Sequence, residues 1–299
     1  MFSVIFPGQG SQLVGMGKDL HDKHSLVQDL FKEADDTLGF SISKLVLEGP
    51  KEDLDLTENT QPAIFLVSYS IFKLIKEEFK IDLNKASFFA GHSLGEYSAL
   101  TSAGSLSFSD TLRILKIRGN AMQSSVPKGV GGMVAVLGSE IETIEKIIKD
   151  NKDKYECYIA NDNSMGQIVL SGKINDLEKM MGDLKAANIK NIKLPVSAPF
   201  HCKLMSKATL VMNEEIAKLN FKEPDKIFPF HAGYLSLLTN SIPQGAIESS
   251  AARKRMPAFD QFTACPSSVS SFARQARMPR VCPPWVQNPQ KNPPAIIIR

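Results

Sequence analysis

Residues 91–100 read GHSLGEYSAL and contain a G-x-S-x-G pentapeptide with its serine at position 93. The apolar run 87–90 precedes it and good helix formers follow, so the pattern predicts a strand, a sharp turn and a helix. We expect glycine at positions 91 and 95 because strand and helix approach too closely there for side chains. The pattern therefore predicts a nucleophile elbow, with Ser93 at the helix end that favours a developing oxyanion. A chance match is the alternative, and the flanking pattern disfavours it.

Apolar periodicity predicts further elements before and after this turn. In the large part of the chain these are a strand at 3–6 and helices at 25–38, 62–79 and 111–123. The third begins at Pro62, a residue that the first helical turn tolerates. The spacing Gly8-x-Gly10 invites a dinucleotide-binding interpretation, but Leu13 stands at the third glycine position, so that interpretation is weak.

The pattern then changes to a compact α/β unit. Residues 129–132 read as a flexible connector, and they are followed by predicted strands at 133–137, 155–160, 167–171 and 189–196 and helices at 140–149 and 174–187. The resulting order βαββαβ is that of a small ferredoxin-like unit. The predicted fold class is thus α/β, with a parallel-sheet core at 1–128 and 196–225 that carries a ferredoxin-like insert at 129–195.

Composition narrows the class of protein. With 299 residues, 43% of them apolar and 22% charged, the chain resembles an ordinary globular protein with a sizeable core. No apolar run reaches the length of a membrane span, and the start MFSVIFPGQG lacks a basic leader, so we expect a cytoplasmic protein. The four cysteines show no metal-binding spacing, so free thiols and no metal site are expected.

A serine nucleophile needs a base, and histidine is the usual one. The chain has five histidines, at positions 21, 24, 92, 201 and 231. His92 adjoins the serine, so its side chain is expected to point away from Ser93. It should either pack against neighbouring side chains or contact residues of the site without touching the substrate. His201 lies where the inserted unit returns the chain to the main core, and position makes it the best candidate for the base.

Five separate motifs carry a resemblance. FPGQGSQ at 6–12, TQPA at 60–63, GHSLGEYSAL at 91–100, IRGNAM at 117–122 and SAPFH at 197–201 come in the order seen in malonyl-CoA:acyl carrier protein transacylases. The resemblance covers residues 1–225. It implies an α/β-hydrolase-like core with a ferredoxin-like insert, and transfer of a malonyl group from malonyl-CoA to the phosphopantetheine thiol of acyl carrier protein in fatty acid biosynthesis.

The resemblance also implies residue roles. Ser93 would form a malonyl-serine intermediate, and His201 would act first as general base and then as general acid. The backbone N–H groups of Gln9 and Leu94 would form the oxyanion hole. On the substrate side it places Arg118, Gln61, Asn161 and Phe200, with Arg118 holding the malonyl carboxylate and Phe200 narrowing the pocket. It implies no cofactor and a monomer that binds malonyl-CoA and acyl carrier protein but neither nucleic acid nor membrane.

Two of these residues also have plain structural interpretations. Only Arg113 and Arg118 interrupt 24 lysines before residue 226, and arginine grips a carboxylate with two parallel N–H bonds where lysine does not. Without the resemblance, however, Arg118 reads more simply as an exposed helix residue. Asn161 falls in a segment where asparagine usually serves a turn between strands.

The resemblance stops near Asp225, where the composition changes. The charge balance is −4 up to Asp225 and +7 after it, and ten of the 17 prolines lie in the second part. One interpretation of residues 226–299 is an out-of-frame, replaced or disordered segment, without sustained strand or helix periodicity and leaving the main sheet incomplete. The other is a natural basic extension that contacts an acidic partner or a membrane surface.

Two alternative functions stay open at this point. A serine esterase or thioesterase of the α/β-hydrolase type needs an acidic partner between Ser93 and His201, and Asp162 and Asp176 lie there, both in the predicted insert. The other alternative is a catalytically impaired product, in which the altered C-terminal segment fails to orient His201.

Overall fold

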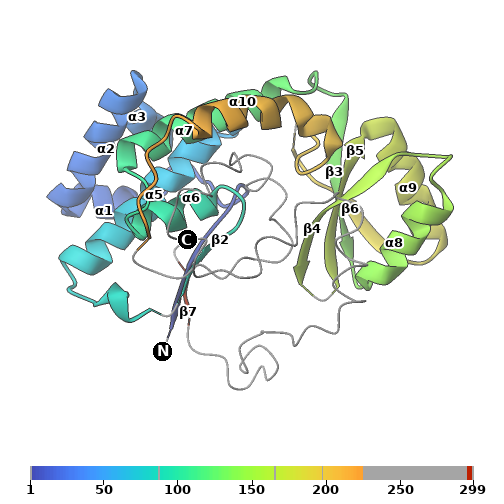
Figure 1. The fold of residues 1–299 in the computed structure, drawn as a ribbon, viewed down its shortest axis with the longest axis horizontal. Helices are drawn as coiled ribbons and strands as arrows, with labels where there is room; N and C mark the ends of the chain where they lie inside the picture. The colour runs from blue at the N-terminus through green and yellow to red at the C-terminus, as the bar shows by residue number, and fades with distance from the viewer. Residues whose placement is uncertain (1, 87, 165, 197, 225–294, 298–299) are drawn as a thin grey trace.

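The computed structural model describes residues 2–86, 88–164, 166–196, 198–224 and 295–297 (Figure 1). Its helices are α1 Lys18–Lys23, α2 Ser25–Leu38, α3 Ile42–Glu48, α4 Lys51–Leu54, α5 Thr57–Glu77, η1 Leu83–Lys85, α6 Gly95–Ser102, α7 Phe108–Ser124, α8 Ile141–Asp150, α9 Ile174–Ala186, η2 Lys203–Met205 and α10 Ser206–Ile216. Its strands are β1 Ser3–Phe6, β2 Phe88–Gly91, β3 Gly131–Leu137, β4 Cys157–Ser164, β5 Gln167–Lys173, β6 Lys190–Lys193 and β7 Ala295–Ile297.

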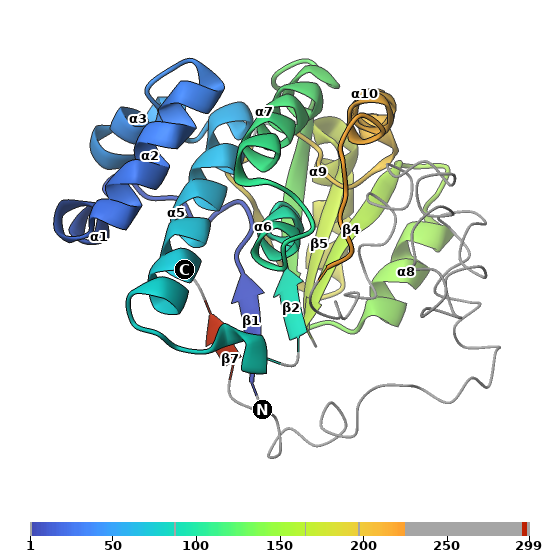
Figure 2. The same ribbon diagram turned by 60° about the vertical axis from the view of Figure 1, so that its left-hand side comes forward.

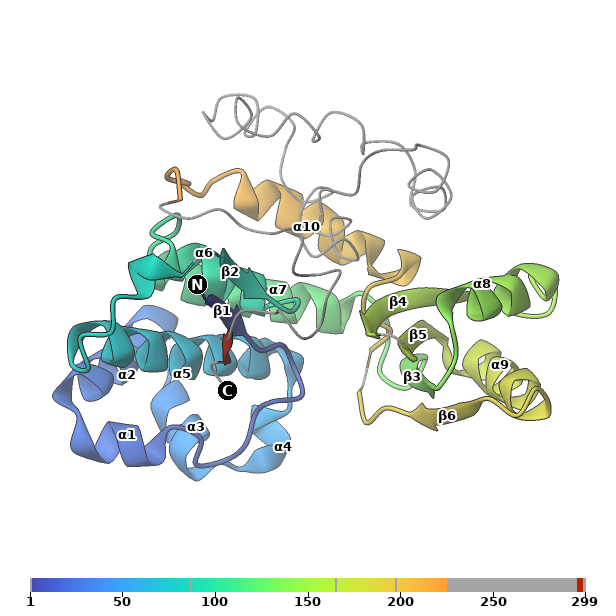
Figure 3. The ribbon, with the colours of Figure 1, turned by 90° about the horizontal axis from the view of Figure 1, so that it is seen from below.

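The architecture is α/β with two sheets. A parallel sheet has the order β2-β1-β7, and an antiparallel sheet has the order β4-β5-β3-β6. Helices α1 to α7 gather around the parallel sheet, while α8 and α9 cover one face of the antiparallel sheet (Figures 1 and 3). Helix α10 packs along α7 and lies between these two groups in Figure 1.

The parallel pairing of β1 with β2 positions the site. Phe6 pairs with Gly91 at the carboxyl ends of both strands, so the loops that follow them leave the sheet at one edge. Helix α6 packs on both strands, with α5 and α7 beside it (Figure 2). Underneath, Phe6, Phe72 and Phe89 are nearly fully buried and their rings contact one another in tilted and edge-on pairs. A rigid aromatic layer thus supports the elbow strand.

Helix α5 begins earlier than the sequence predicts. It starts at Thr57, so Pro62 lies inside the helix and the prediction of a start at Pro62 is wrong. The polar residues before Pro62 give no apolar signal, yet Thr57, Asn59, Thr60 and Gln61 are buried. Asn59 Nδ2 donates to Asp53 O over 2.9 Å, and Thr60 Oγ1 donates to Leu54 O over 2.5 Å. These bonds anchor the turn that the proline would weaken.

The second unit follows the predicted order of elements from β3 to β6, with shifted bounds. Strand β3 begins at Gly131, so half of the predicted connector 129–132 is strand. The last strand, β6, covers 190–193 rather than 189–196. The sheet buries its apolar face against α8 and α9, through residues that include Val134, Ile144 and Leu177.

Strand β3 begins with Gly131 because the space at this position is too small for a side chain. A Cβ atom at this position would lie 2.4 Å from the ring of Pro199, which precedes the His201 loop. Because proline is rigid, we expect Gly131→Ala to lower the free energy of unfolding by about 1–3 kcal/mol. Gly182→Ala is the matched control. Position 182 lies in α9 with nothing within 4 Å of an added Cβ, so that variant should gain about 0.5–1 kcal/mol. Equal urea midpoints for the two variants would contradict this packing argument.

Most of the predicted tail 226–299 lies outside the described residues. The exception is Ala295–Ile297, which pairs in parallel with β1 at the side opposite β2. A short strand thus forms in a segment without sustained strand periodicity. They are apolar and two are β-branched, which suits a β-strand.

In the part of the chain that the structure describes, no helix is both long and apolar enough to cross a membrane.

Candidate active site

Ser93 stands in the sharp turn between β2 and α6. Its φ of 54° is left-handed, which is strained for a residue with a side chain. A Cβ at Gly91 would lie 1.9 Å from the backbone carbon of Gly95, and one at Gly95 would lie 2.5 Å from Phe6 O. The predicted close approach of strand and helix is confirmed, and it leaves glycine as the only residue that fits at both positions.

His201 reaches the serine from the loop that returns from the second unit. Its Nε2 atom lies 3.3 Å from Ser93 Oγ, across 108 residues of chain. Its φ of 57° is also left-handed, so both partners of this contact are held in strained backbone conformations. Burial, the cation of Arg118 and His92 lower the pKa of His201 to about 3. The imidazole is therefore neutral near pH 7 and has a lone pair available as a base.

Arg118 approaches the same serine from α7. Its side chain is only 7% exposed, so the interpretation as an exposed helix residue is wrong. Nη2 donates to Ser93 Oγ over 3.2 Å, and Nη1 donates to Gln61 Oε1 over 2.7 Å. Gln61 is itself buried in α5, where it fixes one edge of the guanidinium. A buried cation next to the nucleophile suits an anionic group on the substrate.

Gln9 and Leu94 follow the paired strands β1 and β2, so the parallel register brings their loops together. The contact is close, since a Cβ at Gly8 would lie 2.7 Å from His92 O. The side chain of Gln9 donates to Thr57 Oγ1 over 3.3 Å, which ties its loop to the start of α5. Two backbone segments thus lie close together at the carboxyl ends of β1 and β2, next to the turn that carries Ser93.

Asn161 is not a turn residue. It lies in β4 next to a bulge and is 7% exposed, so the turn interpretation is wrong. Its Nδ2 donates to His92 Nε2 over 3.2 Å, and that nitrogen also lies 3.3 Å from Asn163 Oδ1. His92 is exposed rather than packed, and it connects the elbow to the second unit. Sequence reasoning missed this contact because it joins residues about 70 positions apart.

Phe200 precedes His201 and is 6% exposed. It belongs to a buried cluster shared by both units, whose members include Met122 on α7 and Met133 on β3. The cluster anchors the histidine loop between the two units.

Glu96 was not singled out from the sequence. It follows Ser93 by three positions in the first turn of α6, where burial raises its pKa to about 7 despite the cation of Arg118. The sequence signal that could have identified Glu96 is its carboxyl group within the motif GHSLGEYSAL at 91–100.

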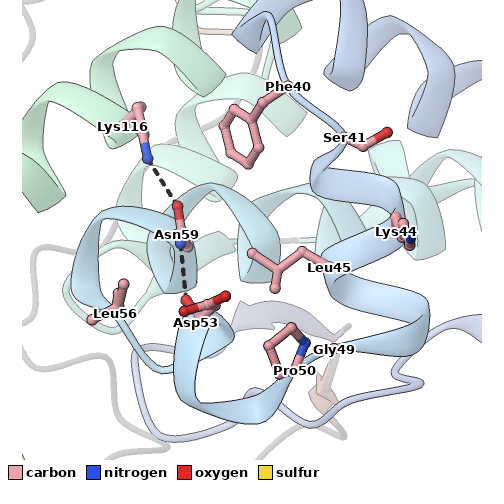
Figure 4. Close-up of a pocket in the computed structure, with 10 residues that line it drawn as sticks. All are labelled: Phe40, Ser41, Lys44, Leu45, Gly49, Pro50, Asp53, Leu56, Asn59 and Lys116. Carbon is pink, nitrogen blue, oxygen red and sulfur yellow. Dashed lines mark hydrogen bonds between the residues drawn. The ribbon is translucent and has the colours of Figure 1, made fainter.

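A cavity of about 340 Å³ lies between α3, α4, α5 and α7 (Figure 4). Its walls include Phe40, Lys44, Asn59 and Lys116, and Lys116 Nζ donates to Asn59 Oδ1 over 2.8 Å. None of the predicted site residues lines it, so it is separate from the Ser93 site. Within the described residues, no group of three His, Cys, Asp or Glu side chains is arranged to hold a metal ion.

Comparisons with known proteins show which family the chain resembles. Residues 3–244 match the model of the acyl transferase domain. A curated relative, the malonyl CoA-acyl carrier protein transacylase of Salmonella typhimurium, is 38% identical over 75% of this chain and 72% of its own length. The solved acyl-carrier-protein S-malonyltransferase of Bartonella henselae superposes with a TM-score of 0.76, at 38% identity and 81% coverage of both chains.

A further similar structure is that of a malonyl-transacylase in complex with a type II polyketide synthase acyl carrier protein. It superposes with a TM-score of 0.72, at 38% identity, and covers 75% of this chain and 72% of that one.

Proposed function

Since the chain belongs to the malonyl CoA-acyl carrier protein transacylases of the acyl transferase domain family, we propose that Ser93 is its nucleophile and His201 its general base. The chain is an acyltransferase, and it transfers malonyl groups between malonyl-CoA and acyl carrier protein in fatty acid synthesis. The observation that carries the residue assignment is that Ser93 Oγ lies within hydrogen-bonding reach of both His201 Nε2 and Arg118 Nη2.

In the first half of the reaction, His201 Nε2 takes the hydroxyl proton as Ser93 Oγ attacks the thioester carbonyl. The backbone N–H groups of Gln9 and Leu94 would stabilise the oxyanion of the tetrahedral intermediate. When the intermediate collapses, the C–S bond breaks, and His201 returns its proton to the CoA thiolate. The product is malonyl-Ser93.

In the second half, the phosphopantetheine thiol of acyl carrier protein gives its proton to His201 and attacks the serine ester. The C–O bond to Ser93 then breaks, and the proton returns to Ser93 Oγ. One elbow thus serves two acyl transfers in a ping-pong sequence. These residues supply the nucleophile, base and oxyanion donors themselves, so we propose that the reaction needs no cofactor.

Arg118 would hold the malonyl carboxylate, with Gln61 fixing the orientation of the guanidinium. Asn161 and Phe200 are proposed to act on the substrate side, through the His92 contact and through the packing of the histidine loop respectively. A buried arginine favours the malonyl group over a neutral acyl group, because only the malonyl group offers the guanidinium a free carboxylate to bind.

We also propose finer names for the architecture. Residues 1–128 and 196–225 would form an α/β-hydrolase-like core, residues 129–195 a ferredoxin-like insert, and residues 226–299 a separate C-terminal segment. The strand order β4-β5-β3-β6 with α8 and α9 on one face supports the second name. The proposed location is the cytoplasm.

The esterase alternative is not favoured. Asp176 forms an ion pair with Lys179 on the same helix, and Asp162 is exposed on β4. The relatives are transacylases rather than hydrolases. The following test also distinguishes an active enzyme from a catalytically impaired one.

Mass spectrometry of acyl carrier protein, incubated with the enzyme and malonyl-CoA, tests the proposal and the role of Arg118 together. The wild type should add malonyl to the carrier protein. Arg118→Lys should lower kcat/KM for malonyl-CoA by roughly 10²-fold, since lysine cannot make two parallel bonds. Arg113→Lys is the matched control on the same helix, because Arg113 is exposed and pairs with Asp110. No transfer by a folded wild type would support the impaired alternative, and equal loss in both variants would contradict the role of Arg118.

A further inference from the structure

One edge of the His92 ring lies directly against the loop that follows β1. The main chain of His92 is fixed on both sides, because its N–H donates to Phe6 O over 3.1 Å and its carbonyl accepts from Gly95 N over 3.0 Å. An added Cβ at Gly8 would lie only 2.5 Å from His92 Nδ1. The imidazole and the loop backbone at Gly8 are therefore in direct contact, with no room for a side chain between them.

The opposite edge of the same ring contacts β4 in the second unit. Nε2 of His92 lies 3.2 Å from Asn161 Nδ2 and 3.3 Å from Asn163 Oδ1. One of these atoms is a donor and the other an acceptor, so Nε2 has a hydrogen-bond partner whether or not it carries a proton. The imidazole thus bridges the loop after β1 and the second unit in either tautomer.

The bridged loop carries one of the two proposed oxyanion donors. Gln9 follows Gly8 directly, so a shift of the loop at Gly8 also moves the Gln9 N–H. The next two residues, Gly10 and Ser11, are exposed, so this part of the loop is not held by a core. The Gln9 side chain makes one long hydrogen bond of 3.3 Å, to Thr57 Oγ1. The imidazole adds a second contact that restrains the loop.

We propose that His92 is a positioning residue, which joins the Gly8–Gln9 loop to β4 and so fixes the Gln9 N–H where the oxyanion forms. The inference rests on the proposed function of the site, in which Gln9 donates to that oxyanion. Oxyanion donors act by being held in place before the charge develops. Outright loss of one donor typically lowers turnover by roughly 10²- to 10³-fold, so a misplaced donor should cost less, about tenfold.

Two amide variants separate the two edges of the ring. The amide of His92→Gln reaches the place of Nε2, where it can donate or accept and keeps the bridge to β4. The amide of His92→Asn reaches only the place of Nδ1 and loses the bridge. In His92→Asn, kcat/KM for malonyl-CoA and for acyl carrier protein should both fall about tenfold, because one oxyanion hole serves both half-reactions. His92→Gln should stay within about threefold of the wild type.

Binding and folding are measured separately. The Kd of malonyl-CoA, determined in a Ser93→Ala background, should change less than about twofold when His92→Asn is added, because the bridge acts on the transition state. Since the His92 side chain is exposed, the melting temperature should stay within about 3 °C of the wild type. His24→Asn is the matched control, because His24 also joins two segments, through Glu78, and should leave both kcat/KM values unchanged.

Asn163→Ala tests the bridge from its other end. Asn163 is exposed on β4, so this variant should fold, and it should lower kcat/KM by about threefold. Added to His92→Asn it should cost nothing more, because both changes remove the same bridge. The proposal is overturned if His92→Asn reacts like the wild type, if His92→Gln loses as much as His92→Asn, if the Kd of malonyl-CoA rises tenfold, or if the two losses multiply. A wild type that is never acylated at Ser93 would instead overturn the proposed function.

Discussion

Ser93→Ala should abolish the malonyl adduct that forms on the wild type during brief exposure to malonyl-CoA. Alanine has no oxygen to attack the thioester, so the covalent route disappears and only slow background transfer remains. The elbow should still fold, because alanine is smaller than serine and the turn is held by the close approach of Gly91 and Gly95. Intact-mass analysis is the measurement, since a malonyl ester adds a defined mass.

Ser98→Ala is the matched control for this experiment. Ser98 lies in α6, five positions further along the chain than Ser93, and is fully buried. It should be acylated like the wild type. An adduct on Ser93→Ala would place the nucleophile elsewhere. If neither the wild type nor Ser98→Ala forms the malonyl adduct, although both chains melt cooperatively, the elbow does not react.

His201→Ala should lower the rate of Ser93 acylation by roughly 10³- to 10⁵-fold, measured in a single turnover. Without Nε2 beside it, the Ser93 hydroxyl keeps its proton and is a weak nucleophile. His21→Ala is the control, because His21 lies in α1 next to Asp22 and should leave the rate unchanged. Equal rates for the two variants would exclude His201 as the base.

The lowered pKa of His201 gives a second readout. Its native value of about 3 lies below the ordinary value of 6.5, so between these values the unfolded chain binds a proton that the native protein does not. More protons on the unfolded state mean that stability rises with pH across this window and falls on acidification. His201→Ala should therefore weaken the acid sensitivity of the melting temperature between about pH 6.5 and about pH 4. An unchanged acid sensitivity would argue against a desolvated histidine.

The order of the elements and the elbow were predictable from the sequence. Gly91 and Gly95 flank a serine between a short apolar run and a helical pattern, and each of these signals is local. Helix α2 was predicted with its observed bounds because its apolar stripe and its closing Gly39 lie within one continuous segment. The start of α5 was missed for the opposite reason, since its first turn is polar and buried through contacts to other segments.

Motifs in which neighbours along the chain constrain one another, such as GHSLGEYSAL, are readable without a structure, and they identify the candidate residues of the site. Tertiary structure alone decided which of them meet and what their charges become. The contact between Ser93 and His201 joins positions 108 residues apart, and that of Asn161 with His92 joins two units of the fold. The burial of Arg118 and the raised pKa of Glu96 come from desolvation, which exists only once surrounding elements have packed and excluded water.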